Sequence, residues 1–158
     1  MKSRKAEEPR PAYESPTPFR RRRVHVAAVY CSDGRVGEQI DEFLGHLLGS
    51  SLCDRLAVPG GPASLRSRSR APAESRGVKA QLGFLAEAHG LTRVILIAHV
   101  PCAFYRERLR IPDDRQHDRQ TQDLRQAADV VRSLGPITVE AWSARVVRSK
   151  VRFYPVPV

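Results

Sequence analysis

Two short runs of apolar and β-branched residues constrain the fold of this chain more than any other feature. The run 23–30 reads RVHVAAVY, and the run 92–98 reads TRVILIA. Continuous apolar runs of this length are typical of strands that are buried on both faces, as in a parallel sheet covered by helices. Segments with helical periodicity lie at 38–48 and 74–89, between and beside these runs. The pattern therefore predicts strands that alternate with helices.

The remaining segments extend this alternation. Their order predicts an α/β fold in which a mainly parallel β-sheet is flanked by helices, as a single domain over residues 23–158. Residues 1–22 are rich in Pro, Arg, Glu and Ser, so we expect them to form a disordered, basic tail. The further elements that we expect are strands at 52–58, 137–147 and 151–155, a helix at 120–134 and a long loop at 59–73.

The charge of the chain is uneven. Among its 158 residues, 27 Lys and Arg stand against 17 Asp and Glu, which gives a net charge of +10. Residues 1–23 hold eight basic and three acidic residues, so about half of the excess lies in the tail. No nucleic-acid-binding motif accompanies it, so we interpret the tail as a solvated arm and expect no nucleic-acid partner. No apolar run approaches the roughly 20 residues of a membrane span, and the N-terminal segment has no apolar core typical of a secretory signal, so we expect a cytoplasmic protein without a membrane partner.

The three cysteines argue against a disulfide scaffold, because their number is odd and small, and they point to metal ligation, reactivity or plain burial. Cys53 has no polar neighbours suited to a metal, and we interpret it as a core residue. Cys31 follows one predicted strand directly, while His99 follows another and Cys102 comes three residues later. The carboxyl ends of neighbouring parallel strands meet at one edge of a sheet, so these side chains are expected to converge. Two thiolates and an imidazole suit zinc and leave its fourth position open, as in catalytic zinc sites.

Asp33 and Arg35 lie two residues apart in the loop that follows Cys31. A carboxylate beside a zinc ion tends to bind it and block the open position. A guanidinium can hold that carboxylate away in a bidentate pair. The freed oxygen can then accept a hydrogen bond from a zinc-bound water and orient it. We therefore expect Asp33 and Arg35 to act as a catalytic dyad.

These motifs resemble those of a known family. The segment 31–36, CSDGRV, resembles the Cys-x-Asp-x-Arg signature of the β-class carbonic anhydrases, and the segment 99–102, HVPC, resembles their His-x-x-Cys motif. The resemblance covers about residues 24–156. It implies zinc held by Cys31, His99 and Cys102, an Asp33–Arg35 dyad, and assembly into a homodimer or a higher homo-oligomer. The implied activity is that of a carbonic anhydrase, a lyase in which zinc-bound hydroxide hydrates carbon dioxide reversibly to bicarbonate.

The chain departs from the family at two places near the site. Ala103 and Phe104 stand where the family has Gly and Ala, and the segment 58–62, VPGGP, replaces an Asn-containing loop. Two alternatives therefore stay open. One is a hydrolase of a small analogue such as carbonyl sulfide or carbon disulfide, and the other is a catalytically inactive zinc-binding or anion-sensing module.

Other polar residues receive simpler interpretations from the sequence. We expect the arginines at 66, 68 and 70 to lie in a solvated loop, although such a run can also draw an anion towards the site. Tyr105 and Phe104 fit packing as well as substrate contact. The remaining histidines are expected in structural or surface positions: His25 in a strand, His46 and His89 on helices, and His117 in a charged loop.

Overall fold

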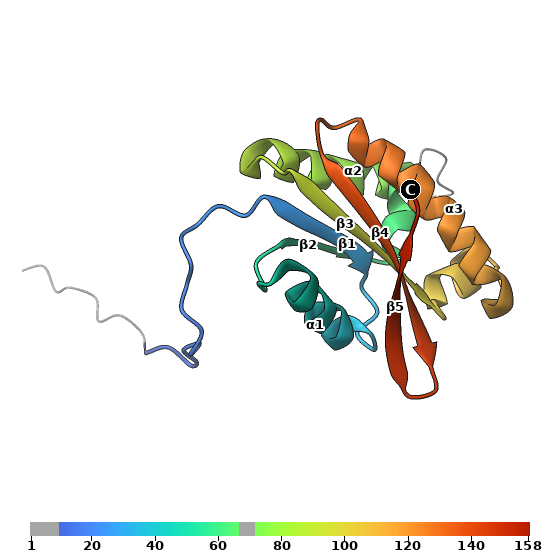
Figure 1. Cartoon of the computed structure of the whole chain (residues 1–158), viewed down its shortest axis with the longest axis horizontal. Coiled ribbons are helices and arrows are strands. Elements are labelled where there is room, and N and C mark those ends of the chain that lie inside the picture. The colour runs from blue at the N-terminus through green and yellow to red at the C-terminus, as the bar shows by residue number, and fades with distance from the viewer. Residues whose placement is uncertain (1–9, 67–71) are drawn as a thin grey trace, which may run out of the picture.

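One mixed sheet organises the computed structural model, which describes residues 10–66 and 72–158 (Figure 1). Within these residues the sheet has five strands in the order β2-β1-β3-β4-β5. The first four run parallel and β5 is antiparallel to β4, so the predicted α/β class and mainly parallel sheet are confirmed. The strands are β1 (Val26–Cys31), β2 (Asp54–Val58), β3 (Arg93–Val100), β4 (Thr138–Val147) and β5 (Lys150–Val156).

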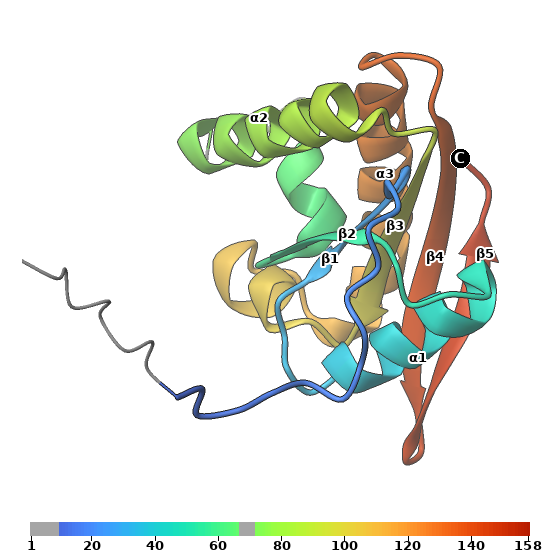
Figure 2. The same ribbon diagram turned by 90° about the vertical axis from the view of Figure 1, so that its left-hand side faces the viewer.

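Helices cover both faces of the sheet (Figure 2). Helix α1 (Gly37–Leu48) packs on one face, while α2 (Pro72–His89) and α3 (Asp113–Arg132) pack on the other. Successive residues of a strand point to opposite faces. In β1, Ala28 therefore joins the core under α1 and Val29 joins the core under α2 and α3. This double burial explains why the central strands read as unbroken apolar runs.

Several predicted boundaries differ from those of the structure. Strand β3 continues to Val100, so His99 lies inside the strand rather than after it. Helix α3 begins at Asp113, well before residue 120. Its start was missed because the first buried residues of the helix are Gln116, Gln120 and Asp123, which form no apolar pattern. The expected loop at 59–73 contains a short 3₁₀ helix, η1 (Gly61–Leu65), and the start of α2, while residues 67–71 lie outside the described part.

Residues 10–21 extend away from the sheet and helices (Figure 1). Residues 10–22 are exposed and form neither helix nor strand, while residues 1–9 lie outside the described part. Arg22 donates a hydrogen bond of 3.0 Å to Ser50 Oγ at the surface. Among the described residues, no helix has the length and apolar character needed to cross a membrane.

Candidate metal centre

The ends of two neighbouring strands bring the predicted ligands together. Cys31 is the last residue of β1, His99 is the last but one of β3, and Cys102 follows β3 in a turn. Strands β1 and β3 are paired up to Tyr30 and Ile97, just before these positions. The three side chains are buried, and one ligand atom from each lies within 4.8 Å of the others. The structure therefore brings Cys31, His99 and Cys102 together as the sequence predicted.

The chemistry of this group fits a zinc ion. Cys31 Sγ and Cys102 Sγ are 3.8 Å apart and form no disulfide. Both ring nitrogens of His99 are buried without a hydrogen-bond partner among the described residues. An unpartnered buried imidazole is costly, and a metal ion would bind one of its nitrogens and remove part of that cost. Two soft sulfurs and one imidazole nitrogen match the preference of zinc.

The thiols of Cys31 and Cys102 differ in their pKa. A hydrogen bond from Cys102 to Cys31, aided by His99, lowers the pKa of Cys31 to about 4 against the opposing effect of burial. The same contact and burial raise the pKa of Cys102. The group therefore favours one thiolate that accepts a hydrogen bond from the neighbouring thiol. Thiolate is the form of cysteine that binds metals.

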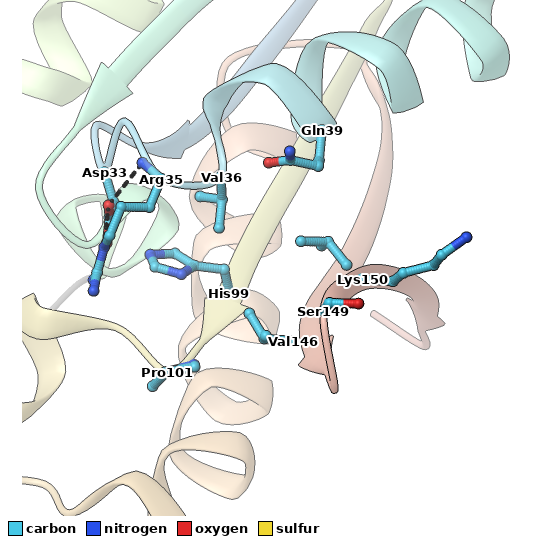
Figure 3. A pocket seen from close by; sticks show the side chains of 10 residues that line it. Asp33, Arg35, Val36, Gln39, His99, Pro101, Val146, Ser149 and Lys150 are labelled. Atoms are coloured by element: carbon cyan, nitrogen blue, oxygen red, sulfur yellow. Dashed lines mark hydrogen bonds and ion pairs between the residues drawn. The ribbon is translucent and has the colours of Figure 1, made fainter.

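The Asp33 carboxylate is held by Arg35 beside the His99 ring (Figure 3). Arg35 donates from Nε to Oδ1 at 2.9 Å, from a terminal nitrogen to Oδ2 at 2.6 Å, and from its backbone N–H to Oδ1 at 3.1 Å. These bonds lower the pKa of Asp33 to about 2. The side chain of Asp33 is 15% exposed and that of Arg35 is 70% exposed, so the pair lies where the buried group meets solvent.

Two cavities meet at this pair. One of about 350 Å³ has His99, Gln39 and the tip of the β4–β5 hairpin in its walls (Figure 3). The other, also of about 350 Å³, has Cys31 and Phe104 in its walls. Asp33 and Arg35 line both cavities. A small molecule in either cavity would therefore lie beside the dyad.

Sequence reasoning missed two buried glutamines of α3. Gln120 Nε2 donates to the backbone oxygen of His99 at 2.8 Å. Gln116 accepts from the backbone N–H of Cys102 at 2.7 Å and donates to the backbone oxygen of Cys102 at 3.2 Å. Their spacing of four residues would have indicated one helical face, but the expected helix began only at Gln120, and the stretch that contains Gln116 was expected to be a charged loop.

A second buried network lies beyond Cys102, around Asp123 of α3. Tyr105 donates to Asp123 Oδ2 at 2.7 Å, and burial raises the pKa of this tyrosine well above its usual range. Arg66 and Arg119 bind the other carboxylate oxygen at 3.3 and 3.0 Å. Arg66 is 3% exposed, so its expected place in a solvated loop is wrong, and residues 68 and 70 lie outside the described part. Tyr105 is thus a packing residue.

The other histidines lie outside the group of Cys31, His99 and Cys102, which we call the metal group. His25 is exposed before β1, rather than inside a strand, and one of its ring nitrogens lies 3.0 Å from the oxygen of Gly90. His46 is exposed on α1, while His89 contacts Asp54 at 2.6 Å. His117 lies on α3, not in a loop, and its Nε2 lies 3.1 Å from Arg145.

Cys53 also lies apart from the metal group. It is half-buried and packs against the core under α1. Burial raises the pKa of its thiol, opposite to the change at Cys31. Its position agrees with the interpretation of Cys53 as a core residue.

The fold and the site together define an α/β protein with a mainly parallel sheet. Two thiols and an imidazole at the carboxyl ends of its central strands form a site suited to a soft metal ion. The chain belongs to a carbonic anhydrase family, because the family model described as "Putative carbonic anhydrase" matches residues 21–146. No curated protein sequence matches the chain significantly.

Solved structures of β-carbonic anhydrases share this fold. The chain is similar to a β-carbonic anhydrase of the fungal pathogen Aspergillus fumigatus, with 12% identity and a TM-score of 0.52 over 86% of this chain and 77% of that one. It is also similar to β-carbonic anhydrase isoform I of the protozoan Trichomonas vaginalis, with 14% identity and a TM-score of 0.54 over 89% and 87%. At these identities the likeness establishes the fold.

Proposed function

We propose that this chain is a zinc-dependent carbonic anhydrase of the β class, which hydrates carbon dioxide reversibly to bicarbonate. The observation that carries the proposal is the buried group of Cys31, His99 and Cys102, whose imidazole has no other partner among the described residues. These three residues would hold the zinc ion. When bound, zinc lowers the pKa of a water molecule and so supplies a nucleophile at neutral pH.

The dyad would orient that nucleophile. Arg35 occupies one side of the Asp33 carboxylate and keeps it ionised, as the lowered pKa of Asp33 indicates. A carboxylate oxygen has a second lone pair, which can accept a hydrogen bond from the attacking water. Arg35 also restrains Asp33 from turning towards the metal ligands. The dyad therefore sets the direction of the water without taking a position on the metal.

Phe104 would form an apolar wall for the substrate. Its ring lies against Gly60, where an added Cβ would come within 2.4 Å of the ring. The ring also lines the cavity that contains Cys31 and Ala103. Ala103 has an ordinary helical backbone with φ −62° and ψ −35°, so the absence of glycine at this position creates no backbone strain. An apolar wall suits carbon dioxide, which has no dipole and no hydrogen-bond donor.

The test is stopped-flow hydration of carbon dioxide on protein whose zinc content has been measured. We expect about one zinc per chain and a rate that disappears when the metal is removed and returns when zinc is added. Protein that binds zinc but does not accelerate hydration contradicts the proposed reaction. Protein that cannot be loaded with zinc under reducing conditions contradicts the ligand assignment.

The Phe104 wall also favours a second candidate, the hydrolysis of carbonyl sulfide, because this substrate is linear and weakly polar like carbon dioxide. The same zinc-loaded sample decides between the two when sulfide release from carbonyl sulfide is measured beside hydration. Zinc without either activity would identify an inactive zinc-binding module.

We also propose a homodimer, as the resemblance implies, and expect light scattering to give about twice the chain mass of 17.7 kDa.

A further inference from the structure

The imidazole of His99 lacks the side-chain support that a metal-binding histidine usually has. Such a histidine generally donates its second ring N–H to a carboxylate or a carbonyl, which fixes the orientation of the ring. In the described part of the chain, neither ring nitrogen of His99 has a hydrogen-bond partner. Something other than a side-chain partner must therefore fix where this ligand lies.

The backbone of the ligand-bearing turn is held instead. Gln120 Nε2 donates to the His99 oxygen at 2.8 Å, and Gln116 bonds both the N–H and the oxygen of Cys102. Gln116 is itself fixed, because its Nε2 also lies 2.7 Å from Asp113 Oδ1. The two glutamines lie one helical turn apart and are 0% and 1% exposed. Two side chains on one face of α3 thus form hydrogen bonds to the backbone of His99 and of Cys102, the two proposed ligands at the end of β3 and just after it.

The contacts of Gln120 are not explained by stability alone. Its Oε1 is buried and has no hydrogen-bond partner among the residues that the structure describes, so the amide meets only part of its hydrogen-bonding capacity there. A buried polar atom left without a partner destabilises the folded state, and an apolar side chain of the same shape would avoid that cost. Within residues 10–66 and 72–158, the one bond that its amide makes goes to the backbone oxygen of His99. This combination points to a role in placing the ligand.

We propose that Gln116 and Gln120 are positioning residues for the metal centre, acting through the backbone of Cys102 and His99. This inference rests on the proposed zinc site and adds to it the element that controls metal affinity. Loss of the hydrogen bonds from either glutamine would let the backbone of the turn after β3 move. The side chains of His99 and Cys102 would then no longer be preorganised to bind the metal. Mutation of residues that support metal ligands typically weakens metal binding by about 10- to 100-fold.

The decisive variant is Gln120→Met, which keeps the length and unbranched shape of the side chain but has no N–H donor. Its matched control is Gln122→Met, because Gln122 is an exposed glutamine on the same helix. We expect Gln120→Met to raise the dissociation constant for zinc about 10- to 100-fold, measured by competition with a chromophoric chelator. The unfolding temperature of the metal-free protein should match that of the control.

Cobalt supplies a readout that does not depend on turnover. Cobalt bound to thiolates gives absorption bands that report the arrangement of its ligands. We expect these bands to shift or weaken in Gln120→Met and to be unchanged in Gln122→Met. Gln116→Leu, which loses both bonds to the backbone of Cys102, should also bind zinc more weakly than the wild type.

The inference is overturned if Gln120→Met binds zinc as tightly as Gln122→Met with the same cobalt spectrum. It is also overturned if Gln120→Met loses stability but not affinity, because the glutamine would then serve folding alone. Wild-type protein that binds zinc but does not hydrate carbon dioxide would contradict the proposed reaction, while these affinities would still decide the role of the glutamines. Wild-type protein that binds neither metal would overturn both proposals.

Discussion

At the scale of single residues, the two cysteines of the metal group differ from the third cysteine in ways that can be measured. Cys102 is 1% exposed and lies 3.8 Å from Cys31, whereas Cys53 is only half-buried and lies in another part of the core. We expect Cys102→Ser to lose most of its zinc, because serine replaces a soft ligand with a weakly acidic hydroxyl. Cys53→Ser should keep about one zinc per chain. Equal zinc content in the two variants, measured after gel filtration, would show that Cys102 is not a ligand.

Asp33 gives a second prediction at this scale. Because its carboxylate is held by Arg35 and is proposed to orient water rather than to bind metal, Asp33→Ala should keep its zinc. Its hydration kcat/KM should fall by about 10²- to 10⁴-fold, the usual contribution of a side chain that is positioned at the group undergoing proton transfer. Zinc analysis and stopped-flow kinetics on one sample check both parts. A variant that turns over like the wild type would remove the dyad from the mechanism.

The clustering of Cys31, His99 and Cys102 and the position of the Asp33–Arg35 pair could be predicted from the sequence, because short-range spacing and strand order determine where these residues lie. Arg66 and the two glutamines could not, because their roles depend on contacts between distant segments. Arg66 binds Asp123 across 57 positions of sequence, and no local pattern indicates such a pair. Residue types that are usually exposed become buried here because a partner from another element satisfies them.

At the scale of elements, the loop after β2 supports the end of β1. Gly61 has φ +53°, and an added Cβ would lie 2.7 Å from the backbone carbon of Tyr30 and 2.8 Å from the nitrogen of Cys31. We expect Gly61→Ala to lower the free energy of unfolding by about 2–4 kcal/mol, since it combines an unfavourable backbone conformation with an overlap against backbone. Zinc affinity should fall as well, because β1 would have to shift at Cys31.

Gly45 provides the control for this prediction. It lies in the interior of α1, and an added Cβ there would meet nothing within 4 Å. Gly45→Ala should stabilise the protein by up to about 1 kcal/mol, the ordinary gain in helix propensity. Urea titrations of both variants would test the contrast, and equal stabilities would mean that the η1 segment does not press on β1.

The success of prediction also differed between elements. Strands β1 and β3 follow continuous apolar runs and helices α1 and α2 follow apolar periodicity, and the structure confirms these elements within a few residues. The first half of α3 has no such periodicity, because its buried face carries Gln116, Gln120 and Asp123. Its helix signals were of another kind: Pro112 stands at the start, and Asp113 and Asp114 lie in the first turn, where acidic side chains favour a helix.

At the scale of the whole molecule, the N-terminal segment is expected to be separable from the metal domain. Residues 10–22 are exposed, and Arg22 contributes one surface hydrogen bond. A chain that begins at residue 23 should therefore unfold within about 2 °C of the full chain and bind the same amount of zinc. Calorimetry and zinc analysis would check this. A fall of more than about 5 °C would show that the segment belongs to the folded unit.

The walls of the cavity beside His99 come from two parts of the fold. The metal group and the dyad come from the central strands and the loop after β1, whereas Val146, Ser149 and Lys150 come from the hairpin between β4 and β5. The tip of this hairpin is exposed at the edge of the sheet, where insertions and exchanges are readily tolerated. Grafting hairpins of different length should therefore reshape this cavity while Cys31, His99 and Cys102 stay in place at the central strands. The sheet then becomes a scaffold on which access to the site can be engineered separately from the residues proposed to hold the metal.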